Sequence, residues 1–224
     1  MVFMKLPVII VNFKLYEQAT GDNALELARI HERVAKETGA SLAIAVNPID
    51  LARVAEAVNI PVFAQHLDPI KFGGHTGHIL PDLIKEAGAY GTLLNHAEYP
   101  IGNEKIIKSL ERCREVGLFT VLCADTPETA RDLVKYNPDL IAVEPPELIG
   151  GDISVSKAGP HIIENAVRMV GENKVLVGAG IRDPEDVTIA LSLGAVGVLL
   201  ASGVTKAKDP YLVLQRLVGG LKQA

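Results

Sequence analysis

Short apolar runs recur along the chain, and each is followed by Gly, Pro or Asn and then by a longer stretch of helical character. Most runs are apolar throughout, as expected of strands that are buried on both faces of a sheet. Several of the longer stretches open with Asp, Thr or Pro and close with Gly, which are start and stop signals of helices. The predicted strands are Pro7–Phe13, Ser41–Val46, Ile60–Gln65, Gly91–Asn95, Phe119–Ala124, Leu140–Glu144, Lys174–Gly178 and Gly197–Ala201.

This series of strands and helices predicts an α/β protein, a parallel (β/α)8 barrel in one domain over residues 1–224. An open, doubly wound sheet is the alternative, but that fold usually has fewer strands and a glycine-rich turn after the first one. The first predicted strand instead ends in Asn12, Phe13 and Lys14, with no glycine. No linker, low-complexity tract or shift in composition divides the chain.

Composition narrows the class of protein. Hydrophobic residues make up 48% and charged residues 22% of the 224 residues, which excludes intrinsic disorder. The net charge of −5 argues against nucleic acid as a partner. Cys113 and Cys123 are predicted to be free thiols in a reducing cytoplasm. No apolar run approaches the roughly 18 residues that span a membrane, and no signal peptide is evident. We therefore expect a cytoplasmic protein without a membrane partner.

Polar residues at the ends of predicted strands are candidates for chemistry, because active sites of such barrels lie at the carboxyl ends of the strands. Lys14 shares a face with Asn12 and would point inward, where it needs an anion; a surface lysine is the alternative. His96 follows the fourth strand, either as a catalyst or as a structural histidine. Glu144 closes the apolar sixth strand as a general base, or else as a helix cap or ion-pair partner. The segment after it, Pro145–Gly151, is a candidate lid.

Small residues follow the last two predicted strands, in Gly178-Ala179-Gly180-Ile181 and Leu200-Ala201-Ser202-Gly203. They allow backbone N–H groups to approach a phosphate, which is the usual position of an anion site in these barrels. Glycine also serves in plain turns, so the indication comes from the two segments together. An acidic protein would then bind a phosphorylated anion through local dipoles and Lys14 rather than through its net charge.

With these motifs in place, the chain resembles the triosephosphate isomerase family along its whole length, most closely the short archaeal-type members. The motifs occur in the order of the family, each at the corresponding strand end. They are Asn12-Phe13-Lys14, Thr76-Gly77, Asn95-His96-Ala97-Glu98, Glu144-Pro145 to Ile149-Gly150, Gly178-Ala179-Gly180-Ile181 and Leu199-Leu200-Ala201-Ser202.

The resemblance implies an enzyme that interconverts dihydroxyacetone phosphate and D-glyceraldehyde 3-phosphate through an enediolate, in glycolysis and gluconeogenesis, without a cofactor. By the same resemblance, Glu144 moves the proton, His96 is the electrophile and Lys14 is the third catalytic residue. Glu98 supports Lys14 by an ion pair. The implied substrate-binding residues are Asn12, Phe13, Lys14, Ile149, Gly180, Ala201 and Ser202.

Some residues depart from the family pattern without touching the proton-transfer groups. Ala97 stands where Ser is common, His78 stands where Glu is usual, and the lid lacks the Trp of many members. His75 and His78 stand three residues apart, but no third ligand lies nearby, so we predict no metal site. The resemblance also implies a homo-oligomer, a dimer at least and a tetramer in the archaeal-type form, in which the loop around Thr76 reaches the neighbouring subunit.

Two other functions are weighed against this one. The first is another phosphate-binding barrel enzyme, such as a sugar-phosphate isomerase or a lyase of amino-acid biosynthesis, which would lack the trio Lys14, His96 and Glu144. The second is a catalytically silent sugar-phosphate sensor or structural homologue, which would be favoured if one of the trio were lost. The chain carries all three residues.

Overall fold

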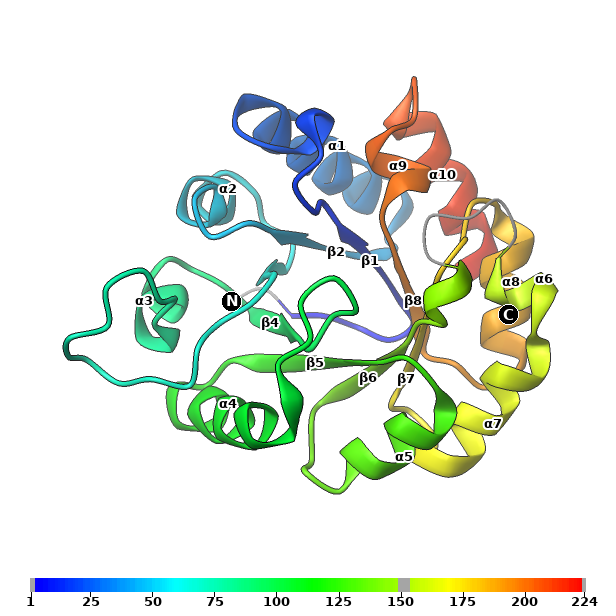
Figure 1. Cartoon of the computed structure of the whole chain (residues 1–224). Coiled ribbons are helices and arrows are strands. Elements are labelled where there is room, and N and C mark those ends of the chain that lie inside the picture. Colours follow the sequence, from blue (N-terminus) through cyan, green and yellow to red (C-terminus); the bar gives the residue numbers. More distant parts are fainter. Residues whose placement is uncertain (1–2, 149–153, 223–224) are drawn as a thin grey trace.

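Eight parallel strands close into a barrel in the computed structural model, which describes residues 3–148 and 154–222 (Figure 1). Each strand pairs with the next one along the chain, and β8 pairs with β1 to complete the ring. This topology confirms the predicted (β/α)8 barrel. The strands are β1 (Val8–Asn12), β2 (Ser41–Val46), β3 (Val62–Ala64), β4 (Gly91–Leu94), β5 (Phe119–Ala124), β6 (Leu140–Val143), β7 (Val175–Gly178) and β8 (Gly197–Leu200).

Helices surround the barrel on its outside (Figure 1). Each stretch that follows a predicted strand contains a helix, as the sequence pattern indicated, and α6 and α9 are further short helices that the pattern did not indicate. Within the described ranges, no helix is long and apolar enough to cross a membrane. The helices are α1 (Asp22–Thr38), α2 (Leu51–Ala57), α3 (Pro81–Glu86), α4 (Gly102–Val116), α5 (Pro127–Val134), α6 (Val155–Ala158), α7 (Pro160–Val170), α8 (Pro184–Ser192), α9 (Ser202–Thr205) and α10 (Pro210–Leu221), with 3-10 turns η1 (Glu17–Ala19) and η2 (Pro146–Leu148).

The alternation of side chains along the strands divides the core into two layers. In β1, Val8 and Ile10 belong to the cluster that fills the barrel, whereas Ile9 and Val11 belong to the layer between strands and helices. The next inward position is Asn12, which is buried at the carboxyl end of the strand. The strand therefore carries a polar side chain to the mouth of the barrel on top of an apolar interior.

A fully buried histidine, His31, lies on the inner face of α1. Its Nδ1 is 2.7 Å from the carbonyl oxygen of Leu27, and its ring centroid is 5.4 Å from that of Phe13. A carbonyl oxygen can only accept, so Nδ1 carries the proton of the neutral ring and donates it. Burial lowers the pKa of His31 to about 4, although the bond to Leu27 acts in the opposite direction.

We expect His31 to weaken the fold in mild acid. The unfolded chain binds a proton at His31 near pH 6.5 and the folded chain only near pH 4, so stability is full above pH 6.5 and is lost between these values. The loss should approach about 3 kcal/mol. Urea unfolding at a series of pH values measures it, with His31→Leu as the reference that cancels other titrating groups. A reference protein whose stability falls as steeply as that of the unaltered chain would contradict the expectation.

Candidate active site

The carboxyl ends of the strands surround a small pocket, and most of the predicted site residues meet there. Predicted residues in its wall are Asn12, Lys14, His96, Glu144, Gly180, Ala201 and Ser202. The wall also contains residues that were not predicted to bind substrate: Tyr16, Ala179, Ile181, Arg182, Leu199, Leu200 and Gly203. A larger cavity of about 690 Å³ near Pro7 and Leu221 contains none of the predicted site residues. The candidate active site is therefore the smaller pocket.

Lys14 adopts a φ of 50°, a left-handed conformation that is uncommon for a residue with a Cβ atom. Its backbone N–H donates to Asn12 Oδ1 at 3.0 Å. Gln65, directly after β3, donates from Nε2 to the Lys14 carbonyl oxygen at 2.9 Å and to Asn12 Oδ1 at 3.3 Å. Strained backbone of this kind persists where neighbours hold it, and it is common at functional sites. Gln65 ended a predicted strand but was not predicted to belong to the site.

The ammonium group of Lys14 pairs with Glu98, as the family resemblance implied. Lys14 Nζ lies 2.8 Å from Glu98 Oε1. The Lys14 side chain is 10% exposed, whereas that of Glu98 is 58% exposed. Because water reaches Glu98, the pair adds little stability, and its main effect is to orient the lysine at the pocket wall.

His96 stands in the loop after β4 as a neutral imidazole. Its Nδ1 accepts a hydrogen bond from the backbone N–H of Glu98 at 3.1 Å, so the proton of the neutral ring is on Nε2. Nε2 faces Glu144, with 3.6 Å to Oε2. Burial and the charge of Lys14 lower the pKa of His96, against the opposing charge of Glu98. A neutral ring with an inward N–H can donate a hydrogen bond to a developing negative charge.

The loop around His96 is set by Asn95, which has a left-handed φ of 58°. Its Nδ2 donates to the carbonyl oxygen of Cys123 on β5 at 3.1 Å, and its Oδ1 accepts from the N–H of Ile101 at 3.0 Å. Asn is one of the few residues that tolerate this backbone conformation. The side chain therefore fastens the loop to the neighbouring strand and leaves His96 directed at the pocket.

Glu144 follows β6 as a buried carboxylate, and its Oε2 has no hydrogen-bond partner among the described residues. Burial raises the pKa of Glu144 to about 7, while the charge of Lys14 and a hydrogen bond from the Cys123 thiol act in the opposite direction. Burial and the nearby Glu144 raise the pKa of Cys123, so that thiol stays protonated and donates. A carboxylate with a pKa near neutrality suits a general base.

Glu144 fits in this position because Gly178, on the adjacent strand β7, has no side chain. A Cβ atom at residue 178 would lie 2.3 Å from Glu144 Cγ and 2.5 Å from Oε1. The Glu144 side chain thus occupies the space that any other residue at 178 would need. The sequence pattern places Gly178 in an anion-binding turn and gives no sign of this contact with Glu144.

The loops after β7 and β8 approach each other closely on one side of the pocket. Ala179 and Gly180 have left-handed φ angles of 78° and 69°. Gly203 in α9 packs so tightly that a Cβ atom there would lie 2.9 Å from the carbonyl oxygen of Ile181. Consecutive small residues in such conformations can turn backbone N–H groups toward an anion.

Two predicted residues do not join this group. The Phe13 side chain belongs to the outer core layer, where it packs against His31 and lies away from the pocket wall. Ile149 lies outside the described residues. His75 and His78 are exposed neighbours with ring centroids 6.0 Å apart. In residues 3–148 and 154–222, no group of three or more His, Cys, Asp or Glu residues could hold a metal ion.

Comparison with known proteins decides the family. The sequence profile of triosephosphate isomerase matches residues 7–218. The chain belongs to the triosephosphate isomerase family. A triosephosphate isomerase from Archaeoglobus fulgidus is 49% identical over 219 residues, covering 96% of this chain and 98% of the relative. Those from Methanobacterium bryantii and Methanocaldococcus jannaschii are both 47% identical, covering 95% and 94% of this chain and 96% and 98% of the relatives.

A solved structure adds independent support for the fold. The crystal structure of triosephosphate isomerase from Bartonella henselae matches with a TM-score of 0.73 and 19% identity, covering 93% of this chain and 97% of that one. At this identity the match concerns the fold alone. The family profile and the archaeal relatives confirm that the chain is an isomerase of the archaeal-type form of the family.

We expect Gly178→Ala to lower the turnover of this isomerase about 100-fold while the barrel stays folded. The added methyl group displaces the Glu144 carboxylate by about 1 Å, and misplacement of that order costs this much in rate. Steady-state kinetics and circular dichroism measure activity and folding. The matched control is Gly219→Ala on α10, where an added Cβ atom would meet nothing within 4 Å and kcat should not change. Retention of more than half of the kcat in Gly178→Ala would show that the carboxylate does not need this space.

Proposed function

We propose that the protein interconverts dihydroxyacetone phosphate and D-glyceraldehyde 3-phosphate in the cytoplasm, as a step of glycolysis and gluconeogenesis, with residues 1–224 acting as one domain. Family membership and the names of the archaeal relatives support this substrate. The observation that carries the proposal is the arrangement of the trio. Glu144 is buried and has a pKa of about 7, and its Oε2 lies 3.6 Å from Nε2 of the neutral His96. Lys14 lies in the wall of the same pocket.

The reaction moves a proton between neighbouring carbon atoms. Glu144 removes a proton from the carbon beside the carbonyl; the electron pair of that C–H bond forms the double bond of an enediolate, and the carbonyl π pair moves onto its oxygen. A proton then passes from the hydroxyl oxygen to the former carbonyl oxygen. The protonated Glu144 returns its proton to the adjacent carbon while the other oxygen forms the new carbonyl, which completes the isomerisation. Since a pKa near 7 makes proton uptake and proton release similarly favourable, one carboxylate serves both steps. Hydrogen is only relocated within the substrate, so no electron acceptor is required.

Negative charge develops on the two substrate oxygens during this transfer, and His96 and Lys14 are placed to stabilise it. His96 donates from Nε2, because Nδ1 is occupied by the N–H of Glu98. Lys14 supplies a full positive charge, held at the pocket by Glu98 and Asn12. These groups are oriented before the substrate arrives, so little reorganisation opposes the transition state.

The phosphate of the substrate would bind on the side formed by the loops after β7 and β8. Gly180, Ala201 and Ser202 line the pocket there, and their small side chains leave backbone N–H groups accessible. Ile149 is assigned to the same group by the family resemblance, as an apolar cover over the bound substrate. A closed segment above the enediolate would exclude water and strengthen the electrostatic interactions beneath it.

A catalytically silent sensor of sugar phosphates is the main alternative function. Such a protein needs the phosphate loops, but it has no use for a buried carboxylate whose Oε2 lacks a hydrogen-bond partner among the described residues. Leaving a buried acceptor unpaired costs free energy. Proton transfer explains why Glu144 carries this cost, and binding alone does not.

A coupled assay with D-glyceraldehyde 3-phosphate tests the proposed function, and we expect rapid turnover by the unaltered protein. Glu144→Asp keeps the charge but retracts the carboxylate by one methylene group, on the order of 1 Å, which should lower kcat at least about 100-fold with little change in KM. Glu98→Gln is the comparison, because it alters the support of Lys14 and leaves the base in place. Absence of turnover by the unaltered protein would refute the function, and near-normal kcat in Glu144→Asp would refute the assignment of the base.

We also propose that the protein is a homo-oligomer, a dimer at least and a tetramer in the archaeal-type form. Residues 71–78 are exposed throughout and lie in the loop between β3 and α3, which extends away from the barrel (Figure 1). Thr76 lies within this loop. The loops after the first four strands carry apolar side chains between 56% and 92% exposed. These are Leu15, Ile49, Phe72 and Tyr99. A group of exposed apolar residues on one rim is typical of an interface.

Light scattering should therefore give a mass of at least two 23.9 kDa chains. We expect Phe72→Asp to shift the population toward single chains, because a charge placed inside an apolar interface is left unpaired. Leu212→Asp on α10 is the control, since Leu212 is 53% exposed but does not lie in the loops after the first four strands. A protein that is monomeric at all concentrations, or a Phe72→Asp variant with unchanged mass, would contradict the interface.

A further inference from the structure

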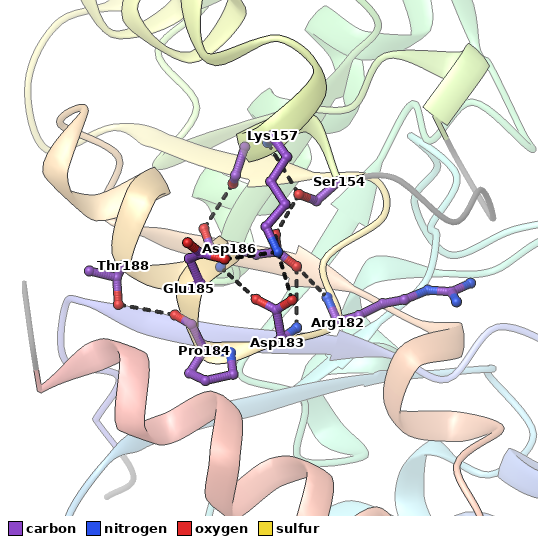
Figure 2. A network of polar contacts seen from close by, with 9 residues as sticks. Ser154, Lys157, Arg182, Asp183, Pro184, Glu185, Asp186 and Thr188 are labelled. Carbon is purple, nitrogen blue, oxygen red and sulfur yellow. Dashed lines mark hydrogen bonds and ion pairs between the residues drawn. The ribbon is translucent and has the colours of Figure 1, made fainter.

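A second network of polar side chains lies where α8 begins, and Asp186 is at its centre (Figure 2). Asp186 is only 2% exposed. A carboxylate is rarely buried to this extent unless several donors compensate for the lost water. Proton transfer and phosphate binding, as described above, give this residue no role.

One carboxylate oxygen of Asp186 holds the loop after β7. Its Oδ2 accepts the backbone N–H of Arg182 at 2.9 Å and that of Asp183 at 3.2 Å. In return, the N–H of Asp186 donates to Asp183 Oδ1 at 3.0 Å, which completes a capping box at the start of α8. This loop continues directly from Gly180, so the capping box also fixes the backbone that borders the pocket.

The other oxygen of Asp186 reaches a distant part of the chain. Its Oδ1 accepts the hydroxyl hydrogen of Ser154 at 2.5 Å. Ser154 is the N-cap of α6 and comes directly after residues 149–153. The next residue, Val155, donates its N–H to the carbonyl oxygen of Ala179 at 3.2 Å. A helix cap would be complete without the bond to Ser154, so this bond has another consequence: it joins the start of α6 to the loop after β7.

Lys157 supplies the positive charge of this network. Its Nζ lies 2.8 Å from Asp183, 3.1 Å from Glu185 and 3.6 Å from Asp186 Oδ1. Hydrogen bonds to Asp183 and Glu185 raise the pKa of Lys157, so it remains charged at any physiological pH. Figure 2 shows its side chain extending from α6 to the carboxylates at the start of α8. The ammonium thus compensates for three acidic groups gathered beside the anion-binding loops.

We propose that Asp186 is a positioning residue for phosphate binding, whose carboxylate holds the loop Ala179–Asp183 at a fixed distance from the start of α6. The inference rests on the proposed function, because it takes the phosphate to bind along Gly180 and Ser202. Loss of the bond between Ser154 and Asp186 then weakens the grip on phosphate and leaves the proton-transfer residues untouched.

Two aldehydes that differ only in the phosphate provide the test. We compare kcat/KM for D-glyceraldehyde 3-phosphate and for unphosphorylated D-glyceraldehyde, together with competitive inhibition by inorganic phosphate. In Ser154→Ala, kcat/KM for the phosphorylated substrate should fall about tenfold and the inhibition constant of phosphate should rise, because part of the binding free energy must then order the loop that the lost bond had held. Turnover of unphosphorylated D-glyceraldehyde should stay within about twofold of that of the unaltered protein.

Ser154 also caps α6, so the matched control removes a cap elsewhere. Thr126 caps α5 through its hydroxyl at 3.1 Å from the N–H of Thr129, and it has no contact with Asp186. Thr126→Ala should cost similar stability and leave the ratio of the two kcat/KM values unchanged. Asp186→Asn is the second variant, and it should show the same selective loss with the phosphorylated substrate.

The outcomes separate the inference from the function on which it rests. A selective loss in Ser154→Ala and Asp186→Asn, absent in Thr126→Ala, supports the positioning role. Equal losses with both aldehydes, or no loss in Ser154→Ala, would overturn that role while the unaltered protein still proves the isomerase function. No turnover by the unaltered protein, together with no binding of inorganic phosphate in isothermal titration calorimetry, would overturn both.

Discussion

Keeping one buried carboxylate ionisable is the constraint on which the arrangement of the barrel mouth depends. Burial raises the pKa of Glu144, while the charge of Lys14 and the Cys123 thiol lower it, and the balance is about 7. A lysine in direct contact would neutralise the base as a permanent ion pair. Lys14 instead pairs with Glu98, so its charge acts on Glu144 from a distance. The same charge, together with burial, keeps His96 neutral.

Holding these groups apart requires a rigid support, and the barrel provides it at a local cost. Lys14 and Asn95 both adopt left-handed backbone conformations where a strand passes into its loop. In each place amide side chains hold the strained backbone: Asn12 and Gln65 around Lys14, and the side chain of Asn95 itself. Such strain is kept where a side chain must leave the regular direction of its strand. Because the strands beneath form a closed barrel, these few hydrogen bonds are enough to hold the backbone of Lys14 and Asn95 in place.

Local patterns in the sequence predicted the barrel well, because recurring apolar runs and the start and stop signals of helices depend on neighbouring residues. The inward direction of Asn12 followed from the alternation of side chains along β1. Phe13, one position away, takes the opposite face and packs in the outer core layer, as the same alternation requires. Glu144 and His96 were identified through their place after strands and through family resemblance, and the structure brings them together.

The features that were missed depend on contacts between distant segments. Gln65 holds Lys14 from another strand, the Cys123 thiol faces Glu144, and α6 and α9 are too short to show a helical period. None of these leaves a signal in the order of residues alone. The polar network around Asp186 is of the same kind, since its key bond joins residues 32 positions apart.

The empty position at Gly178 has a consequence for how this sequence can change over time. Because the Glu144 side chain fills the volume beside residue 178, a substitution at one of the two positions changes what the other can accept. A methyl group at 178 is incompatible with a long acid at 144, and a shorter acid leaves a void that the methyl group would fill. Each change alone carries a packing penalty that the other relieves, but the pair would still lack a carboxylate at the length that proton transfer requires. The base and its glycine therefore constrain each other, although Glu144 follows β6, Gly178 ends β7 and the two residues are far apart in the chain.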